Sequence, residues 1–174
     1  MKTLAFGASN SSNSINKKLA VFAANQVYNE ELTILDLNEF EVAIFSPERK
    51  INHGIPLKIN EFVNHIENAD LIFISFAEHN GSYTAAFKNI FDWATQVKNQ
   101  LFENKKVFLM ATSPGARGGL SVLEAALNRF PRHGAEIVGS YLLPSFYSNF
   151  DTEIGIIDLE LLDSLNKKLN AIQK

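Results

Sequence analysis

The chain has 174 residues, which fits one domain with a sizeable hydrophobic core. Its 46% hydrophobic and 20% charged residues are ordinary for a soluble globular protein. The net charge is −3, and the Lys and Arg residues are scattered, whereas a nucleic-acid-binding protein needs a concentrated basic surface. The absence of cysteine excludes disulfides, a thiolate nucleophile and Cys-ligated metal sites.

Two further classes are disfavoured by the pattern of the chain. No stretch approaches the roughly 20 consecutive apolar residues of a membrane span, and the N-terminus lacks a secretory signal. We therefore expect a cytoplasmic protein without a membrane segment. The four histidines, His53, His65, His79 and His133, have no metal-ligand spacing, so we expect no metal site.

Strand-like and helix-like segments alternate along the chain. The predicted strands are 3–8, 32–37, 71–77, 107–113 and 136–144. Apolar stripes at helical spacing lie in 15–27, 59–66, 87–97, 120–130 and 161–172. The third and fourth strands are almost continuously apolar, as in parallel strands covered on both faces. Five βα units with right-handed crossovers predict a single α/β domain over 1–174, with a parallel sheet between two helical layers.

Two segments interrupt this alternation. Residues 38–56, with Pro47 and Gly54, are predicted to be a long excursion before the second helix. Residues 147–155 are predicted to be a polar stretch before the last helix. Neither segment has the composition of an interdomain linker.

Three loops rich in Gly, Ser and Asn follow the first, third and fourth strands. They read "SNSSNSIN" (9–16), "EHNGSY" (78–83) and "SPGARGG" (113–119). In an open parallel sheet, ligands bind beyond the carboxyl ends of the strands, near the point where the strand order reverses. The three loops therefore predict a binding site at this edge.

The first loop ends where a helix is predicted to begin, with Ser14 as the N-cap. Backbone N–H groups there favour an anion. The side chains that could surround a phosphate are Ser9, Ser11, Ser12 and Ser14, with Asn10 and Asn16. A capped but flexible loop is the equal alternative. Neither GxxxxGK[ST] nor GxGxxG is present, and a loop without Lys fits a monophosphate such as that of FMN.

The other two loops contain glycines that suit a flat ligand. Gly81 lacks a Cβ, so the backbone can approach a planar group closely. The third loop has Gly115, Gly118 and Gly119, more than an ordinary turn requires. It also carries one guanidinium, that of Arg117.

At these loops the sequence resembles the NAD(P)H-dependent FMN reductase family, the flavodoxin-like group that includes quinone, azo-dye and chromate reductases. "FGASNSSNSINKKLA" is similar to the phosphate loop of the family. "AEHNGSYTAAFKNIFDWAT" is similar to Pro-Glu-Tyr-Asn-x-Ser…Leu-Lys-Asn-x-x-Asp-Trp. "TSPGARGGLSVLEAALNRFPRHGAEIV" is similar to the Ser-x-Gly-x-x-Gly-Gly segment. The resemblance implies a flavodoxin-like fold with strand order 2-1-3-4-5.

The resemblance also implies a bound FMN and NADPH or NADH as co-substrate. The phosphate and ribityl chain would contact Ser9, Ser14, Ile15 and Asn16. The isoalloxazine ring would contact Glu78, His79, Asn80 and Gly81 on one side, and Ser113, Gly115, Gly118 and Gly119 on the other. No side chain is expected to act as a catalyst, because the flavin N5 would carry the hydride in a ping-pong cycle.

The implied acceptor is a small molecule such as a quinone, a free flavin, an azo compound or a metal oxyanion. Arg117 is the candidate contact for a nicotinamide phosphate, with a solvated loop charge as the alternative. The resemblance implies a homodimer or homotetramer with the third helix at the interface. In that helix, we expect Trp93 to pack in the core or at the interface, and Asp92 to anchor a loop or pair with a neighbour.

Two departures from the family pattern concern the site. Asn10 stands where many members have Arg, which affects the grip on a phosphate. Ala77 and His79 replace the usual Pro and Tyr, so an imidazole stands beside the flavin in place of a phenol. These changes bear on FMN affinity and substrate preference rather than on the fold.

Two other functions remain open at this point. A hydrolase could use Ser9 as nucleophile, His79 or His133 as base and Asp36 or Asp151 as acid, although no G-x-S-x-G elbow is present. A flavodoxin-like electron carrier or redox sensor would also bind FMN. The mild charge of −3 argues against a carrier, because strongly acidic surfaces guide carriers to their partners.

Overall fold

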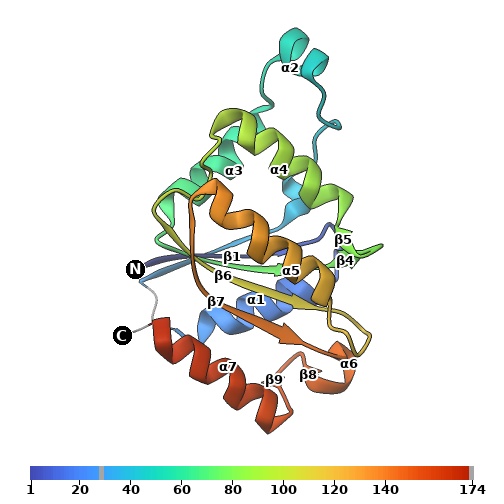
Figure 1. The fold of residues 1–174 in the computed structure, drawn as a ribbon, viewed down its shortest axis with the longest axis vertical. Helices are drawn as coiled ribbons and strands as arrows, with labels where there is room; N and C mark the ends of the chain where they lie inside the picture. The colour runs from blue at the N-terminus through green and yellow to red at the C-terminus, as the bar shows by residue number, and fades with distance from the viewer. Residues whose placement is uncertain (28–29, 173–174) are drawn as a thin grey trace.

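Five parallel strands form the central sheet, in the order β2-β1-β3-β6-β7 (Figure 1). The computed structural model describes residues 1–27 and 30–172. The strands are β1 (Lys2–Ala8), β2 (Glu31–Leu35), β3 (Leu71–Phe76), β6 (Lys105–Thr112) and β7 (Ala135–Leu143). In sequence order this is the predicted 2-1-3-4-5 arrangement, which confirms the flavodoxin-like fold.

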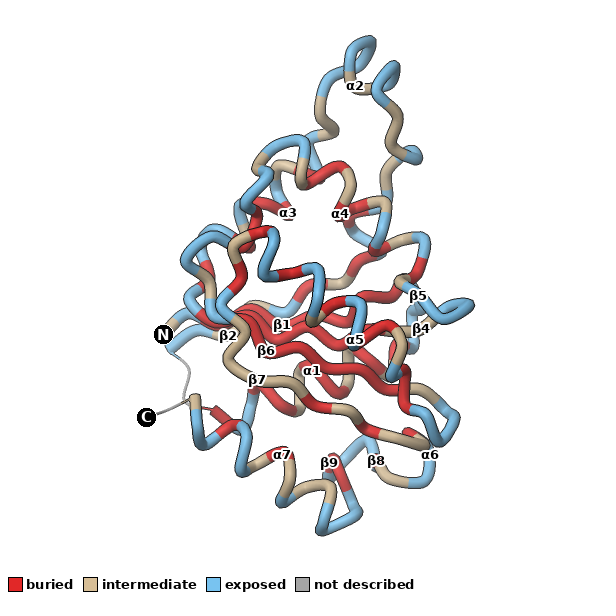
Figure 2. Tube along the Cα trace, viewed as in Figure 1, coloured by how far each residue is buried: buried red, intermediate tan, exposed pale blue. Residues whose placement is uncertain are grey.

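Helices cover both faces of this sheet, as Figure 1 shows. One face packs against α3 (Leu57–Asn68), α4 (Ala85–Val97), α5 (Leu120–Arg129) and the short η2 (Phe130–His133). The other packs against α1 (Ile15–Asn25) and α7 (Leu159–Ile172). Every residue of β3 is buried, and the middle of the sheet is red in Figure 2, because a helical layer covers each face.

The predicted excursion at 38–56 contains two short helices, η1 (Leu37–Phe40) and α2 (Pro47–His53). The start of α2 has local causes: the Ser46 hydroxyl accepts a hydrogen bond from Arg49 N, and Pro47 occupies the first turn. Gly54, with φ at 75°, ends the helix. No residue of α2 is buried, so helical periodicity gave no sign of it.

The second polar loop forms a hairpin of β4 (Glu78–His79) and β5 (Ser82–Tyr83). Asn80 and Gly81 form its turn with φ values of 51° and 75°. Asn-Gly is the pair that favours such a two-residue turn, because both positions need positive φ. Gly81 is therefore explained by the turn, without any requirement for close approach to a ligand.

The predicted polar stretch after β7 is also structured. It contains α6 (Phe146–Asn149) and a hairpin of β8 (Phe150–Asp151) and β9 (Gly155–Ile156). Phe150 packs edge-on against Phe22 of α1, with ring centroids 5.6 Å apart. A Cβ on Gly155 would come within 2.0 Å of the Phe22 ring, so only glycine allows the hairpin to pack this closely.

Candidate functional site

A cavity of about 210 Å³ lies at the carboxyl edge of the sheet, where the three polar loops meet. Its walls come from the segments after β1, β3 and β6, and from α6. The lining residues are Ser9, Ser11, Asn13, Ser14, Ile15, Asn16, Ala77, Glu78, His79, Thr112, Ser113, Pro114 and Tyr147. The loops are thus brought together as predicted, and α6 adds a fourth wall.

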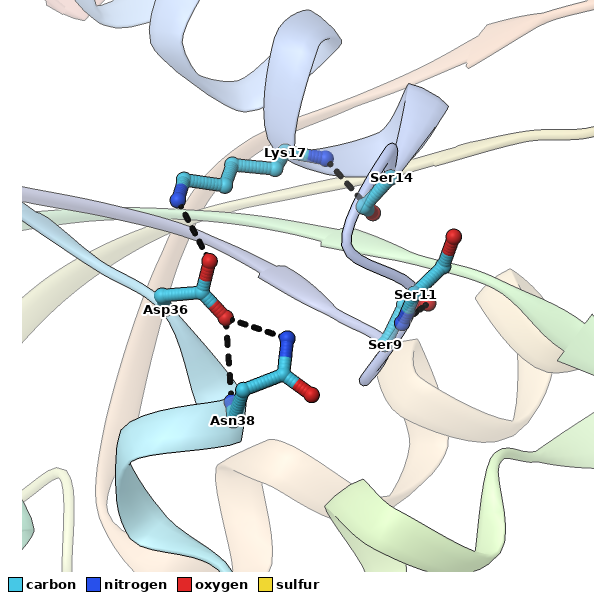
Figure 3. A network of polar contacts seen from close by, with 6 residues as sticks. All are labelled: Ser9, Ser11, Ser14, Lys17, Asp36 and Asn38. Atoms are coloured by element: carbon cyan, nitrogen blue, oxygen red, sulfur yellow. Dashed lines mark hydrogen bonds and ion pairs between the residues drawn. The ribbon is translucent and has the colours of Figure 1, made fainter.

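The first loop presents hydrogen-bond donors to this cavity. Ser14 is the N-cap of α1, as predicted, and its hydroxyl accepts a hydrogen bond from Lys17 N at 3.1 Å (Figure 3). Within the described part of the chain, the N–H groups of Ile15 and Asn16 have no partner. The hydroxyls of Ser9 and Ser14, both nearly buried, can also donate. This set suits an anion.

The loop can turn this tightly because Gly7 brings α1 directly against β1. A Cβ on Gly7 would lie 2.4 Å from Lys17 N and 2.8 Å from Lys17 Cα. Any larger residue would push the first turn of the helix away from the strand. Gly7 therefore sets the position of the unpartnered N–H groups relative to the sheet.

Asn16 lines the cavity, but its side-chain amide is hydrogen-bonded to other residues of the protein. Its Oδ1 accepts hydrogen bonds from Thr112 N at 3.1 Å and from Ser75 Oγ at 2.6 Å. Its Nδ2 donates to Thr112 O at 3.1 Å. The backbone N–H of Asn16 is therefore the better candidate ligand than its amide.

Lys17 directly follows this loop, but its ammonium group forms an ion pair with Asp36. Its Nζ lies 2.8 Å from Asp36 Oδ2 (Figure 3). The carboxylate also accepts hydrogen bonds from the backbone and the side-chain amide of Asn38. The hydrogen bond from Lys17 is the main reason that the pKa of Asp36 lies below its ordinary value. The first loop therefore offers the cavity hydroxyls and backbone N–H groups, while the charge of Lys17 is paired with Asp36.

Glu78 links the second loop to the helix that follows the third. Its Oε2 accepts a hydrogen bond from Val122 N, in the first turn of α5, at 3.0 Å. The N-cap of α5 is Gly119, which has no side chain for this role. A carboxylate at a helix N-terminus is also favoured by the helix dipole. Glu78 thus acts as a remote cap that fixes two loops of the cavity to each other.

Five other predicted residues of the second and third loops lie outside the cavity lining. Asn80 and Gly81 form the hairpin turn. Gly115, Gly118 and Gly119 shape the third loop: Gly118 N donates to Gly115 O at 3.1 Å, and Gly118 and Gly119 have positive φ. His79 and Ser113 do line the cavity.

Arg117 is exposed, and it too lies outside the cavity lining. Its guanidinium Nη2 donates to Ser121 Oγ at 3.2 Å.

Tyr147 of α6 is a lining residue that the sequence did not single out. Its side chain is 72% exposed. Phe146 N donates a hydrogen bond to Ser113 O, and Ser145 N donates one to Gly115 O, both at 3.0 Å. These two bonds hold α6 against the third loop. The one available signal was an aromatic residue soon after the fifth strand, at the same edge as the three polar loops.

The family model of NADPH-dependent FMN reductases matches residues 1–148. The chain belongs to this family. It is therefore an NAD(P)H-dependent oxidoreductase with FMN as its cofactor. The expected enzyme class and cofactor are confirmed, and the hydrolase interpretation finds no support.

Several curated relatives and solved structures are similar to this chain. An uncharacterized MG342 homolog from Mycoplasma pneumoniae is 32% identical over 92% of this chain and 98% of its own length. The quinone reductase of Escherichia coli K12 is 24% identical over 75% of this chain and 71% of its own. The flavoenzyme FerB from Paracoccus denitrificans shares the fold, with a TM-score of 0.76 and 19% identity over 98% of this chain and 93% of FerB. The apo form of the NADH:FMN oxidoreductase EMOB also shares the fold, with a TM-score of 0.74. It is 20% identical over 99% of this chain and 89% of its own.

The geometry brings together only part of what a hydrolase would need: Ser9 and His79 line the same cavity, but His133, Asp36 and Asp151 lie outside it. His133 lies in η2, and its Nδ1 is 2.7 Å from Asn99 O. Asp151 accepts hydrogen bonds from Glu153 N and Ile154 N in its own turn. Among the described residues, no hydrogen bond joins Ser9 to a histidine.

The described helices also include none long and apolar enough to cross a membrane.

Proposed function

We propose that this chain, as one FMN-binding domain, passes electrons from NAD(P)H to a small acceptor by a ping-pong cycle at the cavity described above. The observation that carries the proposal is the pair of unpartnered N–H groups of Ile15 and Asn16, two residues that line the cavity together with Ser9 and Ser14. A singly esterified phosphate fits this donor set, because helix N-terminal N–H groups and hydroxyls can donate several hydrogen bonds to its charged oxygens.

The other walls suit the remainder of FMN. When bound, FMN supplies the redox chemistry, because its ring accepts two electrons from a nicotinamide and gives them to an acceptor. Glu78, His79, Ser113 and Pro114 would line the ring. Tyr147, exposed at the same cavity, would cover part of it. Aromatic residues stack readily on flat π-systems.

We further propose that Arg117 contacts the phosphate of the nicotinamide cofactor. Its guanidinium is exposed and held by one hydrogen bond to Ser121. Guanidinium binds phosphate through two parallel hydrogen bonds, so one neutral partner is easily exchanged. The contact would not distinguish NADH from NADPH if it falls on the pyrophosphate.

The proposed acceptors are a quinone, a free flavin, an azo compound or a metal oxyanion. Quinones are supported by the quinone reductases among the relatives, and azo compounds by the azoreductase of Bacillus anthracis, whose fold is similar with a TM-score of 0.64. We also propose that the protein works as a homodimer or homotetramer in the cytoplasm.

The experiment is to add FMN to the purified protein, remove the excess and record the visible spectrum under argon. We expect a flavin absorption band that bleaches with NADPH or NADH and returns when a quinone is added. Ping-pong transfer predicts parallel lines in double-reciprocal plots against the two substrates. A band that no nicotinamide bleaches would favour the carrier or sensor, and no retained flavin would contradict the site.

A further inference from the structure

A second cavity, larger than the cofactor cavity, follows the outer side of α1, and we call it the α1 groove. Its volume is about 730 Å³, within the range of about 300–1,000 Å³ that small-molecule sites have. Its other walls include Ile34 of β2 and the β8–β9 hairpin, which packs on the same side of the sheet as α1 (Figure 1). The groove therefore has the size of a ligand site, and it shares no residue with the walls proposed for the flavin ring.

The α1 groove and the cofactor cavity meet at the first loop. Asn13 and Ser14 line both of them. The unpartnered N–H groups of Ile15 and Asn16, proposed above to hold the FMN phosphate, directly follow this border. A ligand whose phosphate is held in the cofactor cavity can therefore continue from that phosphate into the groove.

The part of α1 that lines the groove is a single stripe on the side opposite to its buried residues. It consists of Lys17, Lys18, Val21, Phe22, Asn25 and Gln26. These positions are three or four residues apart, so they lie on one face of the helix. The stripe changes in character along α1, from ammonium groups through apolar side chains to side-chain amides. With 11 residues, α1 gives it a length of about 16 Å.

The start of the stripe suits a phosphate. Lys17 is paired with Asp36, but no ion pair involves the half-buried Lys18 within the part of the chain that the structure describes. The exposed side chains of Ser12 and Asn13 line the groove at the same end and can donate hydrogen bonds. One unpaired ammonium group with neutral donors can bind a phosphate group.

The middle of the groove suits a flat apolar group. Phe22 is held in place by Phe150, which packs edge-on against it, and by the close approach of Gly155. Ile154 and Ile34 line the groove and are 72% and 45% exposed. Large apolar side chains that remain exposed around a groove indicate a binding surface, and a planar ring packs well against them.

The far end of the stripe and the hairpin supply polar groups that recognise a nucleoside. Asn25 Nδ2 donates to Val21 O at 3.0 Å, which leaves its amide oxygen as an acceptor. The Gln26 amide makes no side-chain hydrogen bond among residues 1–27 and 30–172. Asn and Gln amides pair with the edge of adenine. Glu153 of the hairpin also lines the groove, and carboxylates accept hydrogen bonds from ribose hydroxyls.

We propose that the α1 groove binds an adenylate, and that this adenylate is the AMP half of FAD, so that the chain takes FAD as well as FMN. The inference rests on the FMN site proposed above, because the flavin half occupies the cofactor cavity. The pyrophosphate lies at the border formed by Asn13 and Ser14, with Lys18 beside its second phosphate. The adenylate of NAD(P)H is the other source of this chemistry. It is disfavoured because Arg117, the proposed contact for that cofactor, lies outside the groove lining.

The test is isothermal titration calorimetry of the full chain with FMN, and with FAD that has been freed of FMN. We expect FAD to bind at least as tightly as FMN. Ile154→Asp places a charge against the adenine and should weaken FAD binding about tenfold while leaving FMN binding unchanged. Lys18→Gln removes a charged hydrogen bond and should weaken FAD binding about tenfold, and FMN binding less. Ile154 is exposed and Lys18 is half-buried, so both variants are expected to fold, which circular dichroism checks.

The chain offers a matched control for each variant. Leu159 of α7 is 78% exposed and lies outside both cavities, so Leu159→Asp makes the same charge change away from the groove. Lys58 of α3 is exposed on the other helical layer, so Lys58→Gln is the control for Lys18→Gln. Both controls should leave FMN and FAD binding unchanged. An equal loss of FAD affinity with Ile154→Asp and Leu159→Asp would overturn the proposal.

Two further measurements identify the source of the adenylate. Free AMP should compete with FAD and leave the affinity for FMN unchanged. If Ile154→Asp instead raises the KM of the FMN-loaded enzyme for NADPH and leaves FAD affinity unchanged, the groove takes the adenylate of the nicotinamide cofactor and the FAD assignment is wrong. A protein that binds FMN but not FAD refutes only this inference, whereas a protein that binds neither flavin contradicts the flavin site as well.

Discussion

Asn16 and Thr112 lie 96 positions apart in the sequence and exchange two hydrogen bonds through the Asn16 amide and the Thr112 backbone. Ser75 Oγ donates to the same amide oxygen, and Thr112 Oγ1 donates to Leu143 O at 2.7 Å. These bonds connect the start of α1 with the ends of β3, β6 and β7 beneath the cavity. The floor of the cavity is therefore fixed by hydrogen bonds within the protein itself.

Replacing Asn16 by Ala should destabilise the protein strongly. The Thr112 N–H and C=O would be buried without partners, at about 1–3 kcal/mol for each group. We expect the free energy of unfolding, measured in urea, to fall by about 3 kcal/mol. Asn25→Ala is the control, because Asn25 is exposed and its amide makes a single bond to Val21 O; a loss below about 0.5 kcal/mol is expected. Equal losses in the two variants would contradict this role of Asn16.

Ser14→Ala tests the phosphate cradle against a matched helix cap. Ser14 and Ser46 each accept a hydrogen bond from the third residue of their helix, at 3.1 and 3.2 Å. Either substitution should lower the unfolding free energy by about 1 kcal/mol. Only Ser14 lines the cavity, so only Ser14→Ala should weaken FMN binding, by about tenfold in a fluorescence titration. A similar loss of FMN affinity with Ser46→Ala would place the phosphate elsewhere.

Glu78→Ala should loosen the cavity by releasing the first turn of α5. The lost bond joins the Glu78 carboxylate to Val122 N, and hydrogen bonds to charged groups contribute about 1.5–3 kcal/mol. We expect both a lower melting temperature and weaker FMN binding. Glu78→Gln keeps an acceptor oxygen and should recover most of both quantities. If Gln behaves like Ala, the charge of Glu78, rather than its acceptor role, is what the site needs.

The sequence predicted the sheet and its covering helices because both depend on periodic apolar positions. The buried strands β3 and β6 are continuous apolar runs, and α4 has an amphipathic stripe. The meeting of the three polar loops followed from the same topology, since parallel strands present their carboxyl ends at one edge.

What the sequence could not predict depends on contacts between distant residues. The polar amide of Asn16 suggested a residue that binds a ligand, but its hydrogen-bond partners lie on β3 and β6. Gly81 suggested a flat ligand, but its positive φ serves the Asn-Gly turn. Tyr147 reaches the cavity through the packing of α6 on the third loop. Such roles are set by tertiary hydrogen bonds and packing, which leave no periodic pattern.

The Lys17–Asp36 pair predicts a specific response to acid. The pKa of Asp36 is lowered in the folded protein, first by its hydrogen bond with Lys17, from the ordinary value of 3.8. A carboxyl group with a lowered pKa stabilises the folded state at pH values above its pKa in the unfolded chain. This stabilisation disappears as the pH falls through the pKa of the group in the folded protein.

Lys17→Met should therefore cost about 0.5 kcal/mol at neutral pH, a small figure because the pair is partly exposed. The difference in unfolding free energy between Lys17→Met and the wild type should stay constant above pH 5 or so and vanish at the acid end. Urea unfolding at a series of pH values between about 2 and 7 measures it. Lys167→Met, on the exposed pair of α7, is the control and should show no such trend. A difference that stays constant into strong acid would mean that Lys17 acts by packing rather than by its charge.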